Sequence, residues 1–291
     1  MKGFILINVY SKNEEYLYQA KRMQEEFAIK GVSVDIIEGG NFLLYIENNN
    51  IESKINEYDF CVFWDKDKYL LKMLEKINMP TFNSCDAILT CSDKMLTHIA
   101  LANKGIPMPK TYAGLLCYNK EQDIKPETLD FLETLGYPLV VKDSYGALGK
   151  GVYLAKNREE LYSLMNLVKY RAHLFQEYVE TSYGRDVRVI VIGNEVVGGM
   201  LRKGNNDFRS NVGVGGLGEP FSLTEEMKQL ALKVVNILGL DYCGMDMLFG
   251  ENGPIICEVN SNAFFHMFEK VTKINVAQKY VQYILNKMKK N

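Results

Sequence analysis

Residues 139–154 read LVVKDSYGALGKGVYL, in which two apolar segments flank a loop with three glycines in six positions. The segments predict two strands, and the glycines let backbone N–H groups of the loop approach an anion closely. The loop is not a Walker A motif, because Gly151 stands where that motif needs Ser or Thr, and a strand follows instead of a helix. The dinucleotide fingerprint also runs from strand to helix and does not fit. A phosphate-binding loop and a plain hairpin loop both remain open from this stretch.

Lys142 ends the first of these two strands. A lysine at the inner end of a buried strand must keep its ammonium solvated or paired. An anion held at the adjacent loop, to which Lys150 adds positive charge, would supply the partner. The alternative is a lysine whose side chain reaches the surface.

A second polar group lies near the C-terminal end of the sequence. Glu258 and Asn260 must share one face of a predicted strand, because side chains alternate along a strand. Asp246 lies on the strand before it, and the turn sequence GENGP at 250–254 predicts a hairpin. With an odd number of residues in the connection, Asp246 would lie opposite Glu258. Two carboxylates and an amide oxygen on one face predict a Mg²⁺ site, and the alternative is the polar edge of a solvated sheet.

The order of elements predicts three units. Strands alternate with helices over 1–90, which predicts a parallel sheet with right-handed crossovers. In the second unit, 91–179, Ser92-Asp93-Lys94 provides a helix N-cap before the glycine-rich loop. The third unit, 180–291, is mostly strand. The expected strands are 4–9, 32–37, 59–64, 137–142, 151–154, 173–179, 187–192, 195–201, 243–249 and 255–260, and the expected helices are 14–30, 69–77, 95–104, 158–168, 224–238 and 275–289.

Basic residues follow one predicted strand of the third unit. Arg202 and Lys203 end the strand, and Arg209 follows in the stretch DFRSN at 207–211. These groups could meet a metal-bound polyphosphate. The next stretch, GVGGLG at 213–218, is too rich in glycine for a regular element and is either a loop that closes over a ligand or a flexible connector.

The composition narrows the class of protein. The chain has 291 residues, 47% of them hydrophobic, with 34 Lys and Arg against 36 Asp and Glu. This is a globular composition and not that of a disordered chain. The near-neutral charge argues against a nucleic-acid partner, and the absence of a long apolar run argues against a membrane span. The six cysteines show no C-x-x-C pair, which predicts reduced thiols and a cytoplasmic location; Cys85 and Cys91 could be half of a metal site or simply core and loop thiols.

The remaining residues give no nucleophilic motif. The three histidines have no Ser or Cys partner in a recognisable arrangement, so a catalytic triad is not expected. The aromatic stretch FFHMF at 264–268 is expected to pack in the core.

Several motifs follow one another between residues 92 and 277. They are SDK at 92–94, VVK at 140–142, the glycine-rich loop, FQEYV at 175–179, DVR at 186–188, DFRSN at 207–211, GMD at 244–246 and EVN at 258–260. In this order they resemble the ATP-grasp ligases, and most closely the RimK-type amino-acid and glutamate ligases. The resemblance implies a parallel α/β domain at 1–90, followed by an ATP-grasp fold of two α+β subdomains.

The resemblance also implies roles for individual residues. Lys94 and Lys142 would contact the phosphates of ATP, and the glycine-rich loop would cover them. Arg209 would steady the γ-phosphate, with Asn211 close by, and Arg202 would lie near the substrate carboxylates. The loop residues concerned are Ser144, Gly146, Gly149, Lys150 and Gly151; Gln176, Glu177, Tyr178, Val179 and Asp186 would lie around the nucleoside; and Asp246, Glu258 and Asn260 would hold two Mg²⁺ or Mn²⁺ ions.

The implied reaction is the ATP-dependent joining of a carboxylate to an amine through an acylphosphate. The implied partners are ATP, an amino acid and a carboxylate acceptor, peptide or small molecule, and family habit implies a homo-oligomer, either dimer or tetramer. Two alternatives are a ligase of another substrate class, such as a D-alanine ligase-like or biotin-type enzyme, and a nucleotide-binding module without turnover. The sequence departs from the common family pattern at 261–264, where SNAF replaces Ala-Ser-Pro-Gly, and after Asn211, where the basic residue often found is missing. Both departures put glutamate as the added amino acid in question.

Overall fold

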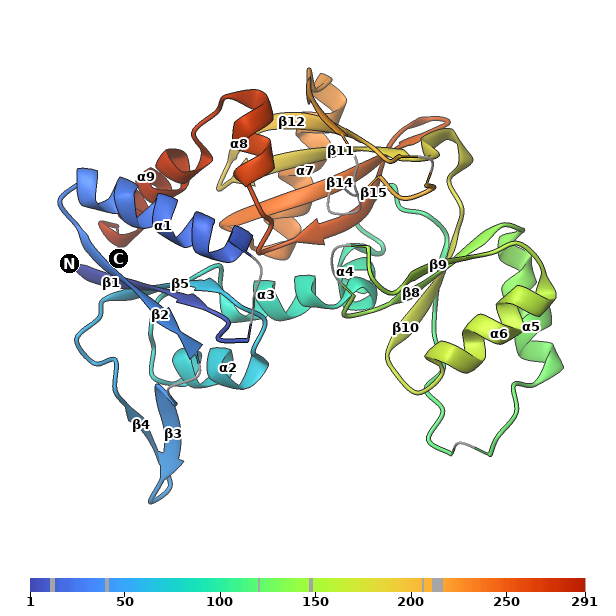
Figure 1. Ribbon diagram of the computed structural model, residues 1–291, viewed down its shortest axis with the longest axis horizontal. Coiled ribbons are helices and arrows are strands. Elements are labelled where there is room, and N and C mark those ends of the chain that lie inside the picture. Colours follow the sequence, from blue (N-terminus) through green and yellow to red (C-terminus); the bar gives the residue numbers. More distant parts are fainter. Residues whose placement is uncertain are drawn as a thin grey trace.

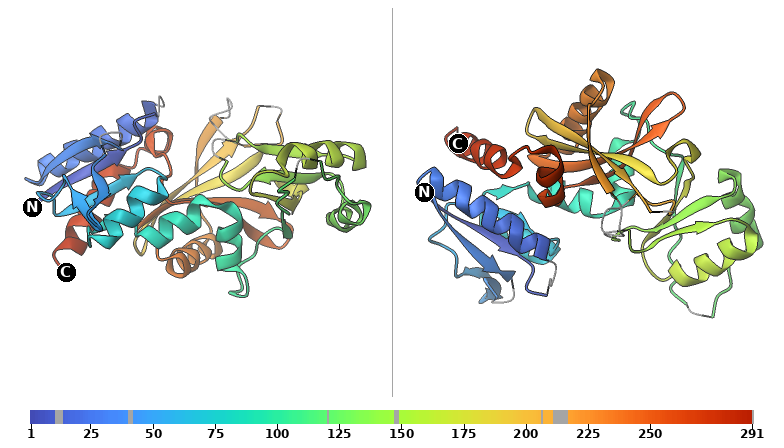
Figure 2. Two further views of the ribbon diagram at one scale, coloured as in Figure 1. Left: turned by 90° about the horizontal axis from the view of Figure 1, so that it is seen from below. Right: turned by 45° about the horizontal axis from the view of Figure 1, so that its top comes forward.

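In a computed structural model, the chain forms three main sheets with helices around them (Figure 1). The structure describes residues 1–10, 14–39, 42–119, 121–146, 149–205, 207–210 and 217–290. The three sheets lie within residues 2–82, 111–177 and 185–260. The mixed α/β fold expected from the sequence is confirmed. The two chain ends lie close together, at the opposite end of the molecule from α5 and α6 (Figure 2).

The first sheet is parallel, with the strand order β2-β1-β5-β6. Its core strands are almost wholly apolar, as strands covered on both faces must be. Phe4 packs toward α2 and α3, and Ile5 packs toward α1. The elements are β1 (Lys2–Ile7), α1 (Glu14–Ile29), β2 (Ser33–Glu38), β5 (Phe60–Trp64), α2 (Lys68–Lys76), β6 (Thr81–Phe82) and α3 (Cys85–Ser92), with a separate hairpin of β3 (Leu44–Glu47) and β4 (Asn50–Ser53).

The second sheet is antiparallel, with the order β7-β10-β8-β9, and has its own small core against two helices. Its elements are β7 (Thr111–Ala113), α5 (Pro126–Leu132), the 3₁₀ helix η2 (Glu133–Leu135), β8 (Leu139–Asp143), β9 (Val152–Ala155), α6 (Arg158–Val168) and β10 (His173–Glu177). The strands on either side of the glycine-rich loop, β8 and β9, pair as a hairpin, as predicted.

The third sheet is antiparallel, with the order β13-β12-β11-β14-β15. One face packs on α7 and α4, and residues of the same sheet join α1, α8 and α9 in a core shared with the first sheet. The elements are α4 (Lys94–Leu101), η3 (Glu180–Ser182), β11 (Arg185–Ile192), β12 (Glu195–Lys203), β13 (Leu217–Phe221), α7 (Glu225–Leu238), β14 (Tyr242–Gly250), β15 (Gly253–Asn260), α8 (His266–Thr272) and α9 (Val276–Met288).

Two buried groups join the first sheet to the third. Trp64 meets the rings of Tyr242, Phe265 and Tyr280 edge-on, with centroids 5.4, 6.4 and 6.0 Å away. Asn83 is 1% exposed, and its amide bonds the backbone of residues 241, 242 and 261 at 2.6–2.9 Å. The expectation that the aromatic stretch packs in the core is confirmed for Phe265 and Phe268, which are fully buried.

The predicted boundaries of the three units stay a prediction. The sheets respect them, but α3 crosses the one between residues 90 and 91, and α9 returns to pack against α1. Short elements that the sequence did not predict are β3, β4, β6, β7, α3, α5, β13 and α8. None of the described helices has the length and the apolar surface that a membrane crossing requires.

Candidate functional site

A cavity of about 680 Å³ lies where the three sheets meet. It is within the size range of small-molecule sites, roughly 300–1,000 Å³. Most of the predicted site residues line it, although they come from different sheets and are up to 166 positions apart (94 to 260). They are Lys94, Lys142, Gly146, Gly149, Lys150, Gln176, Glu177, Tyr178, Val179, Asp186, Arg202, Arg209, Asp246, Glu258 and Asn260. Ser144 and Gly151 are not part of its lining, and Asn211 and residues 213–216 lie outside the described residues.

Gly151 and Ser144 instead shape the glycine-rich loop. Gly151 has a φ of 73°, and a Cβ there would lie 2.3 Å from a carboxylate oxygen of Asp143. The backbone carbonyl of Ser144 accepts a hydrogen bond of 3.0 Å from the N–H of Lys94. The Lys94 ammonium donates to the carbonyl of Gly146 at 2.5 Å. The start of α4 therefore holds the loop at the edge of the cavity.

Lys142 is buried at the junction of the second and third sheets, so the interpretation as a surface lysine is wrong. Its ammonium donates to Oε1 of Gln176 at 2.6 Å and lies 3.5 Å from Sγ of Cys257. The Gln176 amide is oriented by Thr111 Oγ1 at 2.9 Å and by Nε2 of His98 at 3.2 Å. Burial, together with the charge of Lys142, lowers the pKa of His98 to about 4, so the ring is neutral at pH 7 and Nε2 can accept.

Asp246 lies opposite Glu258, as predicted, but for a different reason. The connection between β14 and β15 contains two residues, because Gly250 pairs with Gly253. A regular register would then place Asp246 opposite Cys257. A bulge at Cys257 adds one residue to β15 and moves Glu258 to the cavity face.

Basic side chains surround these carboxylates. Across β11 and β14, Arg188 binds both oxygens of Asp246. Arg202 lies 2.8 Å from Asp246 Oδ2 and forms a bidentate pair with Asp186 at 2.5 and 2.7 Å. Burial alone would raise the pKa of Asp246, but the two arginines outweigh burial and hold its pKa below the usual value.

Glu258 and Asn260 keep oxygens available to a ligand. The side chain of Glu258 is 28% exposed, and Lys94 lies 3.3 Å from one of its oxygens. Asn260 lines the cavity, and its side chain makes no hydrogen bond with the described residues. An oxygen-only set of this kind fits Mg²⁺, and Asp246 would then be shared between the metal and the arginines.

Arg209 lies against the glycine-rich loop. Its Nη1 donates to the carbonyl of Gly149 at 3.1 Å, while Asp207 holds the other side of the guanidinium at 2.7 and 3.0 Å. Next to it, Ser210 donates to Asp186 at 2.5 Å. The residue predicted to meet the γ-phosphate thus faces the loop predicted to cover it.

Two groups of cavity residues were not predicted from the sequence. Arg188 was part of a quoted motif but was given no role; its signal is its position two residues from Asp186, which puts both on one face of β11. Glu15, Tyr16 and Lys66 from the first unit also line the cavity, beside Asn262 and Phe264. No local pattern marks these three, because only folding brings them there.

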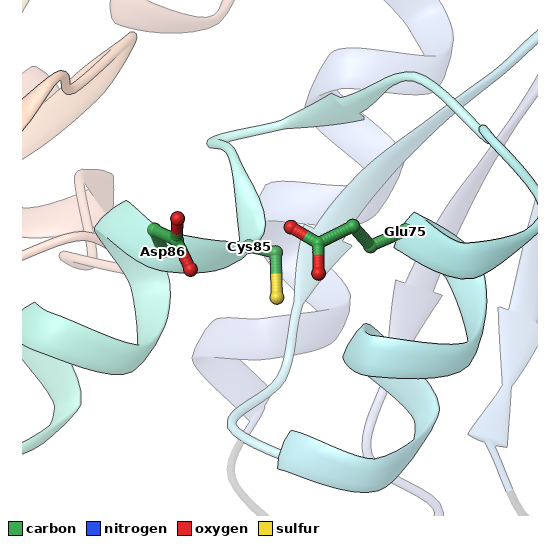
Figure 3. A group of neighbouring side chains, drawn as sticks. All are labelled: Glu75, Cys85 and Asp86. Carbon is green, nitrogen blue, oxygen red and sulfur yellow. The ribbon is translucent and has the colours of Figure 1, made fainter.

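A second acidic group lies outside the cavity (Figure 3). Glu75 at the end of α2 and Cys85 and Asp86 at the start of α3 have potential ligand atoms within 4.8 Å of one another. Lys72 bridges Glu75 and Asp86 at 3.0 and 3.3 Å, and burial raises the pKa of the Cys85 thiol. Lys72 therefore already supplies the cation, and Cys91 is not a member of the group.

Comparison with protein families gives a match over residues 91–284 to the RimK-like ATP-grasp domain. The chain is 37% identical over 276 residues to beta-citrylglutamate synthase B of Homo sapiens, which covers 89% of this chain and 69% of that protein. It is 38% identical over 225 residues to N-acetylaspartylglutamate synthase A of Homo sapiens, and this alignment covers 76% of this chain and 56% of that protein. The chain thus spans between about half and seven tenths of these relatives.

Solved structures share the fold over nearly the whole chain. The D-alanine–D-alanine ligase of Bacillus anthracis complexed with ATP superposes with a TM-score of 0.76 at 18% identity, covering 100% of this chain and 98% of that one. The ATP-grasp ligase PsnB complexed with minimal precursor, Mg and ADP gives 0.70 at 16% identity, covering 99% and 98%. These likenesses concern the fold alone.

Proposed function

The chain belongs to the RimK-like ATP-grasp family, and we propose that it is an ATP-dependent carboxylate–amine ligase that joins glutamate or another amino acid to a small acid or peptide. The observation that carries the proposal is the position of Arg209 against Gly149. A module that only binds nucleotides needs no arginine at the end of the phosphates. Here a cation in contact with the loop lines the same cavity as Asp246 and Glu258.

The cavity residues suit a phosphoryl transfer followed by an amide-forming step. A substrate carboxylate oxygen attacks the γ-phosphorus, the bond to the β–γ bridging oxygen breaks, and ADP leaves. The amine nitrogen then attacks the acyl carbon, phosphate leaves and the nitrogen loses a proton. Lys94, Lys142, Lys150 and Arg209 would bind the phosphates and offset the charge that develops on them.

Mg²⁺, held by Asp246, Glu258 and Asn260, would shield the phosphate oxygens and orient them for the transfer. We propose that two ions bind, as the resemblance implies. Closure of the glycine-rich loop over the ligands would keep water from the acylphosphate. Gln176, Glu177, Tyr178 and Val179 would form the adenine side, with Asp186 near the nucleoside and Arg202 near the substrate carboxylates.

The names of the two relatives supply the first substrates to test. β-Citrylglutamate contains citrate and glutamate, and N-acetylaspartylglutamate contains N-acetylaspartate and glutamate. We infer that the acid acceptor of this chain is of similar size, because a cavity of about 680 Å³ must also receive ATP.

The test is phosphate release from ATP and Mg²⁺ with glutamate and a panel of acids, followed by mass spectrometry of the products. We expect ADP, phosphate and an amide of defined mass in equal amounts. The control is Glu258→Gln, which removes one anionic ligand but keeps the shape and should lower turnover by about 100-fold or more. ADP formation without an amide for any acid would contradict the ligase, and a product from two D-alanines would favour the D-alanine ligase-like alternative.

A further inference from the structure

Lys66 is a cation of the cavity that the nucleotide does not explain. It follows β5 by two residues, at the carboxyl end of a central strand of the parallel sheet. The chain leaves β1 toward β2 on one side, and β5 continues to β6 on the other, so the strand order reverses between β1 and β5. In open parallel sheets, the crevice at such a reversal is where ligands bind.

Four other cations of the cavity already have carboxylate partners. Lys94 faces Glu258, Arg188 and Arg202 face Asp246, and Arg209 faces Asp207. Within the described part of the chain, the ammonium of Lys66 makes no hydrogen bond and no ion pair. Lys150 is likewise without a partner, but it belongs to the loop that would cover the phosphates.

The environment of Lys66 favours an incoming anion. Its side chain is exposed and lines the cavity; the protein around the ammonium and the charge of Lys94 lower its pKa, whereas the nearby charge of Glu258 acts in the opposite direction. An anion between the two ammonium groups would stabilise the charged form of both.

The backbone at Lys66 is held in place relative to the candidate metal ligands. The N–H of Lys66 donates to the carboxylate of Asp65 at 2.6 Å, and Asn8 binds the same carboxylate at 3.1 and 3.2 Å. The amide of Asn262, two residues after Asn260, donates to the carbonyl of Asp65 at 2.6 Å. This contact lies in the SNAF stretch, where the sequence departs from the common family pattern.

We propose that Lys66 binds a carboxylate of the acid substrate other than the one that is phosphorylated, so that the preferred acid carries two or more carboxylates. This inference rests on the proposed function. The reacting carboxylate must lie near Arg209 and the metal face, whereas Lys66 reaches the cavity from the first unit, close enough to Glu258 for the two charges to interact. A second carboxylate would give Lys66 the ion pair that it lacks.

The experiment is isothermal calorimetry on the full chain loaded with a non-hydrolysable ATP analogue and Mg²⁺. The probes are citrate and a matched pair, N-acetylaspartate and N-acetylasparagine, which differ by one carboxylate. We expect wild type to prefer N-acetylaspartate by about tenfold or more, and Lys66→Gln to lose this preference and bind citrate about tenfold more weakly. Lys68→Gln is the matched control, because Lys68 is exposed outside the cavity and should change nothing.

Three results would overturn the inference. The first is an unchanged affinity of Lys66→Gln for citrate. The second is a loss of nucleotide affinity in that variant, which would assign Lys66 to the phosphates. The third is that wild type binds none of these acids. Binding as expected but without amide formation in the turnover assay would contradict the ligase proposal alone. The two proposals can therefore fail separately.

Discussion

On the wall of the cavity made by the third sheet, buried arginines face carboxylates, whereas on the wall made by the second sheet buried Lys142 faces the neutral amide of Gln176. In the first wall, each charge is balanced within the protein, and cross-strand neighbours hold one another in position. In the second wall, the charge of Lys142 is solvated by dipoles only.

The difference assigns the two walls different tasks. Paired buried charges attract strongly in a medium of low dielectric, so the carboxylate wall keeps its geometry without a ligand. An unbalanced buried cation instead raises the affinity of the site for an anion. We infer that the third sheet positions the chemistry, while the second sheet contributes binding energy for the phosphates.

The largest effect is expected at Asp246. Asp246→Ala would leave Arg188 without its bidentate partner and Arg202 with only one carboxylate, so the free energy of unfolding should fall by about 3–5 kcal/mol. Urea unfolding followed by circular dichroism measures the change. Asp246→Asn keeps the shape of the side chain, so its free energy of unfolding should decrease by less. A decrease of less than about 1 kcal/mol in Asp246→Ala would show that these ion pairs do not hold the wall in place.

A smaller effect, of another kind, is expected at Lys142. Lys142→Ala should weaken binding of an ATP analogue by about 10- to 100-fold, since a charged hydrogen bond to phosphate is worth about 1.5–3 kcal/mol. Calorimetry with Mg²⁺ present measures it. Lys156→Ala, an exposed lysine just beyond β9, is the control. Equal affinity in wild type and Lys142→Ala would remove the contrast between the two walls.

The smallest effect concerns pH and His98, which orients Gln176. The pKa of His98 is lowered from 6.5 to about 4, so the unfolded chain takes up this proton at a higher pH than the folded chain. The stability that His98 contributes is complete above pH 6.5 and is lost as the pH falls toward 4. Between pH 7 and 5.5 the loss should be about 1 kcal/mol. His98→Gln should flatten this part of the curve of unfolding free energy against pH, and an unchanged curve would contradict the buried neutral ring.

Much of the site could be predicted because it depends on local patterns. Alternation along β15 places Glu258 and Asn260 on one face, and the three glycines at 146–151 require a loop between two strands. The short elements β6, α3 and α8 were missed because they have too few residues for a period to be seen. Leu17 stands three residues before buried Ala20 in α1 but is 43% exposed, since spacing alone does not tell where a buried stripe ends.

The predicted register of Asp246 and Glu258 shows how a correct pairing can have another cause. The odd-numbered connection that the prediction required is absent, and the bulge at Cys257 supplies the missing residue. The sequence CEVN at 257–260 contains no signal that predicts a bulge, because the position of a bulge depends on what the strand packs against.

By itself, the sequence determined the order of the longer strands and helices, the glycine-rich loop, and which polar side chains share a face, since these follow from backbone sterics and from periods of two and 3.6 residues. Only the tertiary structure decided which charges meet. Arg188 and Asp246 are 58 positions apart, and Asn262 reaches Asp65 across 197. Whether a buried charge meets an opposite charge, as at Asp246, or only a neutral amide, as at Lys142, depends on desolvation and distance, and both exist only once the three sheets have come together.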